Sequence, residues 1–287
     1  MHSTGIYQAV PRLFLLVPFF EAIGELRRCV CSLRHQSADF RAILVDDGSS
    51  QATNLRAREL VGDDERFVLL RRRERQGPAA ARDTGLQYIL EHSVHPRDVV
   101  ILIDGDDRLV RNTALETISD VYGRRPQTKM TLGRSITSGG KRSQSSEYSD
   151  WHFRSNLVRH VLNWRADHPR SFRISLYQQC CEQLRLKLPG GEWIQGGTDV
   201  ALILPMLEIC RPGEVVHIDT ILYEYHINRS DGRTLETSQR GRGEQLLGEY
   251  FTRKSLFFTV WKTLRYPGRS LAVLRAIARR IQKTEPS

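Results

Sequence analysis

Three aspartates stand directly behind a short apolar run, and their types and spacing suggest metal chemistry. The run Val99–Ile103 has the β-branched and aliphatic composition of a fully buried strand. Asp104, Gly105, Asp106 and Asp107 follow it. Crowded carboxylates raise one another's pKa unless a cation neutralises them, and Mg²⁺ or Mn²⁺ prefers oxygen ligands. Since open α/β sheets bind ligands at the carboxyl ends of their strands, the pattern predicts a metal under a phosphate-bearing ligand. The alternative is an acidic turn that caps the next helix.

Two further segments place polar side chains beside apolar runs. Asp46-Asp47-Gly48 follows the apolar run Phe40–Val45 and has turn chemistry. Thr198-Asp199 opens an apolar pattern of helical spacing over 196–208, in which Pro205 would produce a kink. An aspartate at such a position is either a helix cap or a group that accepts a proton.

The elements that must position these residues alternate between strands and helices in the N-terminal half. This alternation predicts an α/β fold with a mainly parallel sheet. The predicted strands are 13–17, 40–45, 67–70 and 99–103, and the predicted helices are 21–33, 51–61 and 77–90.

The pattern is weaker beyond residue 125. Residues 135–149 are rich in serine, glycine and charge and predict a loop, whereas 151–162 and 171–186 have helical spacing. Residues 215–225 alternate like a strand. The last part, 236–287, mixes Arg and Lys with Leu, Phe and Trp. It predicts either a basic amphipathic helix at an anionic membrane surface or a helix packed on the main domain.

Composition restricts the class of protein. The chain has 287 residues, a net charge of +10 and 40% hydrophobic residues, which is typical of a globular protein with an anionic partner. Its five cysteines include no C-x-x-C pair, which argues against a disulfide framework and a zinc site. We find no signal peptide pattern. We therefore expect a cytoplasmic protein, with the basic tail as a candidate contact for the inner face of the plasma membrane.

Five segments, in this order, resemble the family 2 glycosyltransferases. They cover roughly residues 11–230 and match the family's opening strand and proline, its V-D-D-G-S loop, its G-x-x-x-A-R-N-x-G segment, its aspartate metal motif and its E-D base motif. In this sequence they read Leu13–Pro18, Val45–Ser49, Gly77–Leu86, Ile103–Asp107 and Thr198-Asp199. Asp83 stands where the family usually has asparagine, and Thr198 where it usually has glutamate.

The resemblance implies a GT-A fold, with a Rossmann-like, mainly parallel central sheet and flanking helices. The implied domains are a catalytic domain over 1–235 and a helical C-terminal extension over 236–287. The implied activity is inverting, metal-dependent transfer of a sugar from a nucleotide sugar, with UDP as the expected nucleotide, to a glycan or glycolipid hydroxyl. Such a reaction belongs to polysaccharide or cell-envelope biosynthesis.

The resemblance also implies roles for single residues. Asp106 would bind Mn²⁺ or Mg²⁺, with Asp104 at the metal or the ribose and Gly105 between them. Asp47 would read a base N–H, and Arg82 would contact the base or the phosphates. The remaining nucleoside contacts would come from the first loop, at Pro18, Phe19 and Glu21.

On the acceptor side, Asp199 is the expected general base, and burial beside other carboxylates would raise its pKa. Trp193 would stack on a sugar or pack in the core. His226 and Arg229, together with Arg233, would form a lid over the pyrophosphate or a solvated basic loop. His168 and Arg173 would be sugar contacts or structural residues.

Two other classes of protein compete with this interpretation. A nucleotidyltransferase that makes nucleotide sugars would need a glycine-rich, basic loop after the first strand, and the sequence there reads Phe19-Phe20-Glu21. A nucleic-acid-binding protein would fit the positive charge, but RNA-binding modules need aromatic platforms or a known motif. The expected partners are therefore a nucleotide sugar, a glycan or glycolipid acceptor and an anionic membrane, but no nucleic acid.

Overall fold

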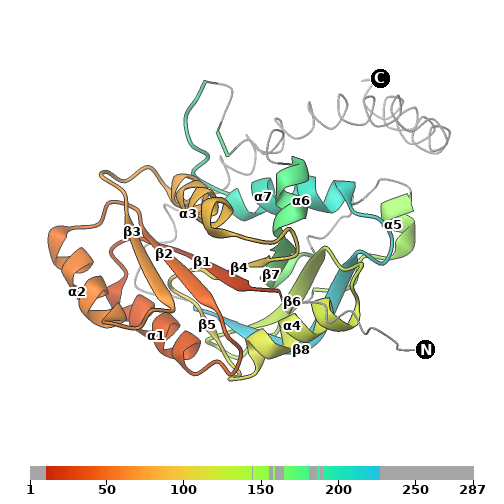
Figure 1. Cartoon of the computed structure of the whole chain (residues 1–287), viewed down its shortest axis with the longest axis horizontal. Helices are drawn as coiled ribbons and strands as arrows, with labels where there is room; N and C mark the ends of the chain where they lie inside the picture. The colour runs from red at the N-terminus through yellow and green to blue at the C-terminus, as the bar shows by residue number, and fades with distance from the viewer. Residues whose placement is uncertain are drawn as a thin grey trace, which may run out of the picture.

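A twisted sheet with helices on both faces forms the protein (Figure 1). The computed structural model describes residues 11–143, 145–154, 158, 165–180, 186–187 and 190–226. The predicted extension over 236–287 lies outside these residues. The strands are β1 (Leu13–Phe19), β2 (Arg41–Asp46), β3 (Phe67–Arg71), β4 (Val99–Leu102), β5 (Arg108–Leu109), β6 (Met130–Thr137), β7 (Asp167–Arg173) and β8 (Val215–Tyr225). The helices are α1 (Ile23–Arg34), α2 (Gln51–Val61), α3 (Pro78–His92), α4 (Ala114–Arg124), α5 (Asp150–Arg154), α6 (Ile174–Cys180) and α7 (Thr198–Ile209).

The strand order in the sheet is β3-β2-β1-β4-β7-β6-β8-β5. Strands β1 to β4 pair in parallel, as the alternation of strands and helices predicts. Strand β7 then runs antiparallel to both β4 and β6, whereas β6 and β8 are parallel. The carboxyl ends of β1, β2 and β4 therefore meet at one edge of the sheet, next to the beginning of β7.

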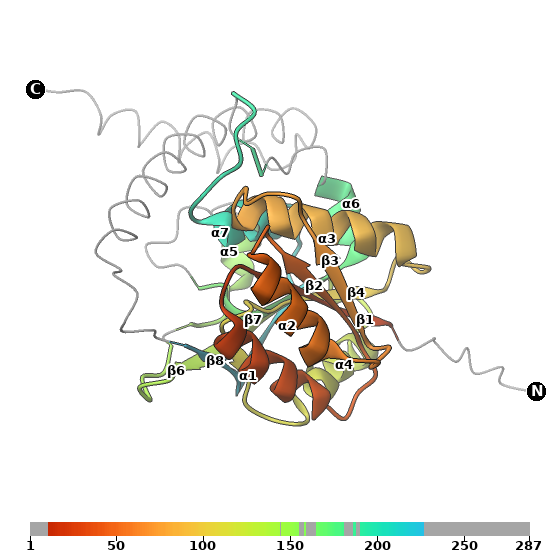
Figure 2. The same cartoon turned by 90° about the vertical axis from the view of Figure 1, so that its left-hand side faces the viewer.

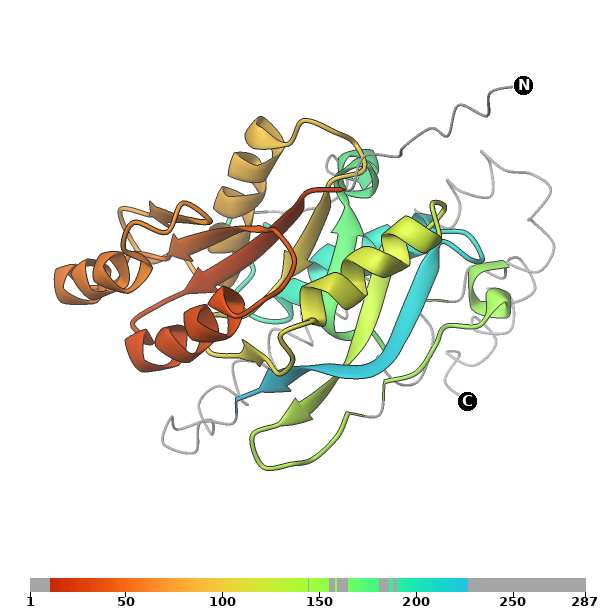
Figure 3. The same ribbon diagram turned by 60° about the horizontal axis from the view of Figure 1, so that its bottom comes forward.

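Side chains alternate between two cores because strands have a period of two. Phe14 and Leu16 pack toward α3, α6 and α7, while Leu15 and Val17 pack toward α1, α2 and α4. Figures 2 and 3 show these two helical layers on opposite faces of the sheet. All four of these side chains are fully or almost fully buried.

Several predictions for the second half are wrong in their boundaries. Strand β6 extends to Thr137, into the stretch predicted as a loop, and the predicted helix over 171–186 begins as the end of β7. Helix α6 starts only at Ile174. Several polar residues of these two strands are buried, so composition alone did not reveal the strands. They are Ser135 of β6 and His168, Arg170, Ser171 and Arg173 of β7.

Strand β1 also continues beyond the predicted end at Val17. Pro18 pairs in register with Val45 and Phe19 with Asp46, so both residues lie in the strand and not in its exit loop. Within α7, Pro205 stands inside an α-helix that runs unbroken from Thr198 to Ile209.

Candidate active site

The aspartate loop after β4 is held against the end of β1. The Gly105 amide donates to the Pro18 carbonyl at 3.2 Å. A Cβ at position 105 would lie 2.8 Å from both that oxygen and the Phe19 Cβ. Only glycine fits such a close approach of two backbones. Gly105 and Pro18 therefore have a structural part in placing Asp104 and Asp106.

Arg82 links this loop to the start of α7. Its Nη2 donates to the Asp104 Oδ1 at 2.6 Å, and its Nη1 donates to the Thr198 hydroxyl. Arg82 lies in the first turn of α3 and is only 6% exposed. A buried guanidinium needs such partners. The arginine therefore joins two segments that are 94 residues apart in the chain, Asp104 and Thr198.

Asp199, directly after Thr198, forms an ion pair with a second arginine. The Asp199 Oδ2 lies 2.8 Å from Nη1 of Arg170, which projects from β7. The N-cap of α7 is Gly197, which has no side chain for capping, and Asp199 lies in the first helical turn. Asp104 and Asp199 therefore stand at two sides of one charged cluster, with Arg82 and Arg170 between them.

These arginines reverse the pKa shift that the sequence predicts for Asp199. Burial alone would raise its pKa, but Arg170 and then Arg82 lower it below the usual range of aspartate. Asp104 behaves in the same way: burial alone would raise its pKa, but Arg82 and the other basic side chains beside it together lower it. The prediction of a raised pKa for Asp199 is wrong for the protein without substrate.

The crowding of carboxylates instead raises the pKa of Asp107. Burial, Asp104 and Asp106 together raise the pKa of Asp107 to about 8. Its Oδ2 accepts a hydrogen bond from the Tyr223 hydroxyl at 2.8 Å, and its Oδ1 accepts from the His226 amide at 2.7 Å. The Tyr223 hydroxyl in turn accepts from the Asp104 amide. Asp107 therefore anchors the aspartate loop to the end of β8.

Asp104 and Asp106 fit a hard cation that is shared with a ligand. Asp106 is exposed, and the Asp104 side chain is 26% exposed. Among the described residues, no three His, Cys, Asp or Glu side chains are arranged as a closed metal site. Mg²⁺ and Mn²⁺ often use one or two carboxylates together with waters and ligand phosphates. Asp104 and Asp106 suit this kind of binding.

Asp47 is deeply buried and holds the loop between β3 and α3. Its two carboxylate oxygens accept from the backbone amides of Gln76 and Gly77, at 3.2 and 2.7 Å. The Arg72 Nε lies 3.1 Å from Oδ1. At 3% exposure, Asp47 orders this loop in the protein without ligand. Its role as a reader of the base stays a prediction.

Glu21 and Phe19 have structural contacts in the protein without ligand. The Glu21 carboxylate accepts from the Ser50 amide and the Thr53 hydroxyl, both at 2.5 Å, and so caps the start of α2. The hydrogen bonds from Thr53 and then Ser50 lower its pKa. The Phe19 side chain is 5% exposed and belongs to the core beneath α1. Phe19 is the last residue of β1 and packs in the core, and its predicted contact with a nucleoside stays a prediction.

The predicted lid and acceptor residues are only partly described. The Trp193 Nε1 donates to the Gln76 side chain at 3.0 Å, and the Lys187 ammonium lies 4.3 Å from the centre of its ring. Trp193 therefore buttresses the loop that holds Asp47. The Nδ1 of His226 lies 2.8 Å from the Arg28 guanidinium, beside the aspartate loop. Arg229 and Arg233 lie outside the described residues.

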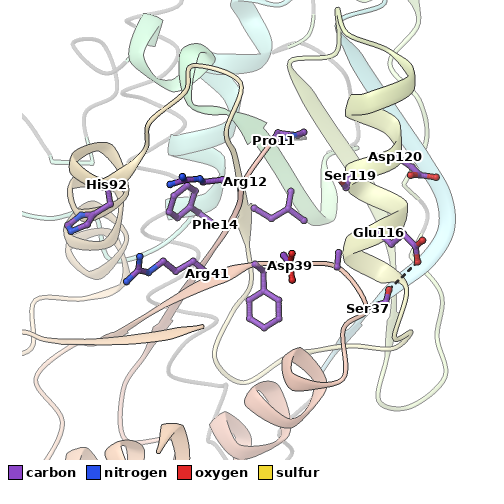
Figure 4. Close-up of a pocket in the computed structure, with 13 residues that line it drawn as sticks. Pro11, Arg12, Phe14, Ser37, Asp39, Arg41, His92, Glu116, Ser119 and Asp120 are labelled. Atoms are coloured by element: carbon purple, nitrogen blue, oxygen red, sulfur yellow. Dashed lines mark hydrogen bonds between the residues drawn. The ribbon is translucent and has the colours of Figure 1, made fainter. Parts of the chain in front are cut away.

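A cavity of about 630 Å³ lies at the other edge of the sheet (Figure 4). It opens at the amino ends of β1 and β2, where Arg12 and Arg41 stand, and Glu116 and Asp120 of α4 border it. Ser37 donates to Glu116 across one side of it. Because the aspartate loop and Asp199 belong to the carboxyl edge, this cavity is not part of the same site.

Tyr223, Arg170 and in part His168 are site residues that sequence reasoning missed. The His168 ring packs on Tyr223 with centroids 4.7 Å apart, and its Nε2 lies 3.9 Å from Asp104. Burial and then Arg170 lower the pKa of His168 to about 4, so the ring is neutral at neutral pH. Arg173 instead binds main-chain carbonyls at the other end of β7. The signal for Arg170 was the His168-x-Arg170 alternation of a strand, but the residues directly after it, from Ser171 onward, are predicted as a helix.

Comparisons with known proteins agree with this architecture. Residues 14–172 match the model of glycosyl transferase family 2. An uncharacterized glycosyltransferase of Haemophilus influenzae is 30% identical over 108 residues, which cover 37% of this chain and 40% of that protein. The structure of S. aureus TarS 1-349 superposes with a TM-score of 0.54 at 15% identity, over 75% of this chain and 60% of that one.

A second similar structure contains a nucleotide sugar and a metal ion. The mannosyltransferase PcManGT from Pyrobaculum calidifontis, in complex with GDP-Man and Mn²⁺, has a TM-score of 0.56 at 14% identity. This match covers 96% of this chain and 76% of that one. The chain spans less than two thirds of the length of the Haemophilus relative and of TarS 1-349. The family match covers more than half of the chain, and so the chain belongs to glycosyl transferase family 2 and has the GT-A fold.

Proposed function

We propose that this chain is a metal-dependent inverting glycosyltransferase. It transfers a sugar from a nucleotide sugar, with UDP as the expected nucleotide, to a hydroxyl of a glycan or glycolipid. The observation that carries this proposal is the cluster in which Arg82 joins the metal-motif carboxylate Asp104 to Thr198, next to Asp199. One carboxylate lies on the donor side of the cluster and the other on the acceptor side.

The chemistry needs both carboxylates. The acceptor oxygen attacks the anomeric carbon from the face opposite the diphosphate, and its proton passes to Asp199. The bond between that carbon and the diphosphate oxygen breaks, and the electron pair stays on the diphosphate. A divalent cation bound at Asp104 and Asp106 supplies charge stabilisation for this leaving group. Arg82 is the nearest buried protein cation, and it would add to that stabilisation.

The similar structures support the donor class. A TarS structure contains UDP-GlcNAc, and the PcManGT structure contains GDP-Man with Mn²⁺. Both ligands are nucleotide diphosphate sugars. The net charge of +10 also suits such an anionic donor. Within the described residues, no helix is both long and apolar enough to cross a bilayer. Peripheral contact through the region 236–287 is part of the proposal.

Calorimetric titration with UDP and GDP tests the metal and nucleotide assignment. We expect UDP to bind in the presence of Mn²⁺ or Mg²⁺, and we expect this binding to be lost when EDTA is added. Asp106→Ala should lose this binding, because the exposed carboxylate of Asp106 is the expected metal ligand. Asp120→Ala is the matched control, since Asp120 lies on α4 at the other edge of the sheet. Metal-independent UDP binding that survives in Asp106→Ala would contradict the assignment.

A further inference from the structure

Arg170 is a full charge in the middle of the sheet. Its strand, β7, lies between β4 and β6, and Arg170 stands in register with Leu102 on one side and Leu132 on the other. Arg170 is 4% exposed. A guanidinium in such a position costs considerable free energy unless it is paired, so a residue with a specific task is expected there.

The contacts of Arg170 hold its guanidinium between a main-chain carbonyl and the Asp199 carboxylate. Its Nε donates to the Ala166 carbonyl at 2.7 Å. Its Nη1 lies 2.8 Å from the Asp199 Oδ2, although this nitrogen makes no aligned hydrogen bond. The contact is therefore an ion pair that leaves lone pairs of the carboxylate available to another donor, such as an acceptor hydroxyl.

We propose that Arg170 is the positioning residue of the general base and holds the Asp199 carboxylate in the direction of the acceptor hydroxyl. This inference rests on the proposed function, in which Asp199 takes the proton. The ion pair joins the first turn of α7 to β7, so the carboxylate is tied to a strand that is paired on both sides within the sheet. Arg170 itself touches Asp199 and not the reacting atoms.

The charges around Asp199 set its pKa, so the role of Arg170 can be measured as a change in the pH dependence of the reaction. The titratable and charged groups that face it are Arg170 and His168 of β7, Arg82 of α3 and Asp104 after β4. Arg170 is the strongest of the influences that lower the pKa of Asp199, and burial opposes it. Without Arg170, the effect of burial is opposed by Arg82, His168 and the hydrogen bond from the Val200 amide, which are weaker influences. The pKa of Asp199 should then rise, and with it the pH below which the reaction slows.

The test uses the full chain and hydrolysis of a nucleotide sugar in the presence of Mn²⁺, with water as the acceptor. The donor is whichever of UDP-GlcNAc, UDP-glucose and GDP-mannose the wild-type protein hydrolyses fastest. In Arg170→Met we expect kcat to fall about tenfold or more, within the usual share of general base catalysis. The affinity for the nucleotide should stay within about twofold, since Arg170 faces the base. The acid limb of the pH profile should move upward.

Arg173→Met is the matched control. Arg173 is a second buried arginine on the same strand, and it donates to the Thr128 and Arg97 carbonyls at 2.6 and 2.9 Å. Its loss should lower the melting temperature without moving the acid limb. Arg170→Lys keeps a positive charge but not the planar fork of the guanidinium. The acid limb of its pH profile should therefore stay at the wild-type pH, while its kcat should be reduced. If Arg170→Met does not fold, Arg170→Lys provides the test of the positioning role. A wild-type kcat in Arg170→Lys would then overturn the proposal.

A double-mutant cycle separates this inference from the proposed function. If Arg170 acts only through Asp199, adding Arg170→Met to Asp199→Asn should cause no further loss of kcat. Additive losses, or an unchanged acid limb in folded Arg170→Met, would show a merely structural arginine. Near wild-type turnover in Asp199→Asn alone would instead overturn Asp199 as the base and leave the metal assignment standing. The two failures are therefore distinguishable.

Discussion

At the scale of single residues, the site is a chain of alternating charges. Asp104, Arg82, Asp199 and Arg170 contribute two negative and two positive charges. Both arginines are buried, so neither is a general attractant for anions at the surface. A diphosphate and its divalent cation would add no large net charge to this cluster. If Asp104 holds the divalent cation as proposed, its ion pair with Arg82 would be exchanged for that cation when the donor binds.

Asp199→Asn is the direct test of the base. Asparagine keeps the shape but cannot accept the proton, so transfer should fall by about 10²–10⁴, the usual share of general base catalysis. Affinity for UDP, measured by calorimetry, should hardly change, because the proposed base would face the acceptor and not the nucleotide. Asp120→Asn is the control and should retain activity, since its side chain is 50% exposed on α4.

A helix cap would give the opposite result. Asparagine caps helices about as well as aspartate, so turnover near the wild-type level would assign Asp199 a capping role. The search for the base would then turn to Glu192, which precedes α7 in the described part of the chain. Asp231 is a further carboxylate, outside the described residues.

The residues of the donor side were predictable to different degrees. The position of Asp104 follows from the apolar run before it, because several consecutive carboxylates rarely continue a buried strand. The partners of Asp104 were not predictable. Arg82, His168 and Tyr223 come from three other segments and meet only in the folded chain. The lowered pKa of Asp199 could not be foreseen for the same reason.

At the scale of elements, close helix–sheet contact sets the position of Arg82. Gly85, one turn after Arg82 in α3, lies directly on β1 and β2. A Cβ there would clash with the Leu16 Cδ1 and come within 3.0 Å of the Val45 Cγ2. Both side chains are completely buried, so they have little room to move.

Gly85→Ala should therefore destabilise the protein. Overpacking of a core typically costs about 1–3 kcal/mol, and the better helix propensity of alanine offsets up to about 1 kcal/mol of this. Urea unfolding should show a net loss of about 1–2 kcal/mol. Gly123→Ala in α4 is the matched control, because a Cβ at that exposed glycine meets nothing within 4 Å. It should leave stability unchanged or raise it, and a loss of stability in both variants would count against the packing argument.

Elements were predictable where one periodicity dominated. The strands β1, β2 and β4 are short apolar runs, and the structure confirms them within two residues at each end. Strand β7 was missed because it carries Asp167, His168, Arg170 and Arg173, four charged or polar side chains with partners inside the fold. Composition marks such a strand as exposed, although it is central in the sheet. Buried ion pairs conceal a strand from sequence patterns.

At the scale of the whole molecule, the two edges of the sheet have different chemistry. The carboxyl edge collects the aspartate loop, Arg82 and Asp199, while the amino edge carries the cavity beside Arg12 and Arg41 (Figure 4). The parallel strands β1 to β4 make this separation inevitable, because their carboxyl ends all point the same way. The net charge of +10 is counted over the entire chain, and much of the excess positive charge lies in the sequence beyond residue 235.

The last prediction concerns that basic region, whose function we infer from sequence. Basic side chains near an anionic membrane contribute about 1 kcal/mol each to binding. Replacing four of them by glutamine should therefore weaken binding to phosphatidylglycerol vesicles, measured by co-sedimentation, by up to about a thousandfold. It should not affect phosphatidylcholine vesicles, and added salt should mimic it. The substitutions are Arg275→Gln, Arg279→Gln, Arg280→Gln and Lys283→Gln.

A matched variant removes the same charge from the catalytic domain. It replaces four exposed arginines by glutamine: Arg27, Arg41, Arg56 and Arg125. If the tail forms the contact, this variant should sediment nearly as the wild type does. Equal weakening by both sets would mean that net charge and not the tail attracts the vesicles. No sedimentation of the wild-type chain with anionic vesicles would assign the basic tail to packing on the protein, because apolar and cationic side chains at helical spacing serve either surface.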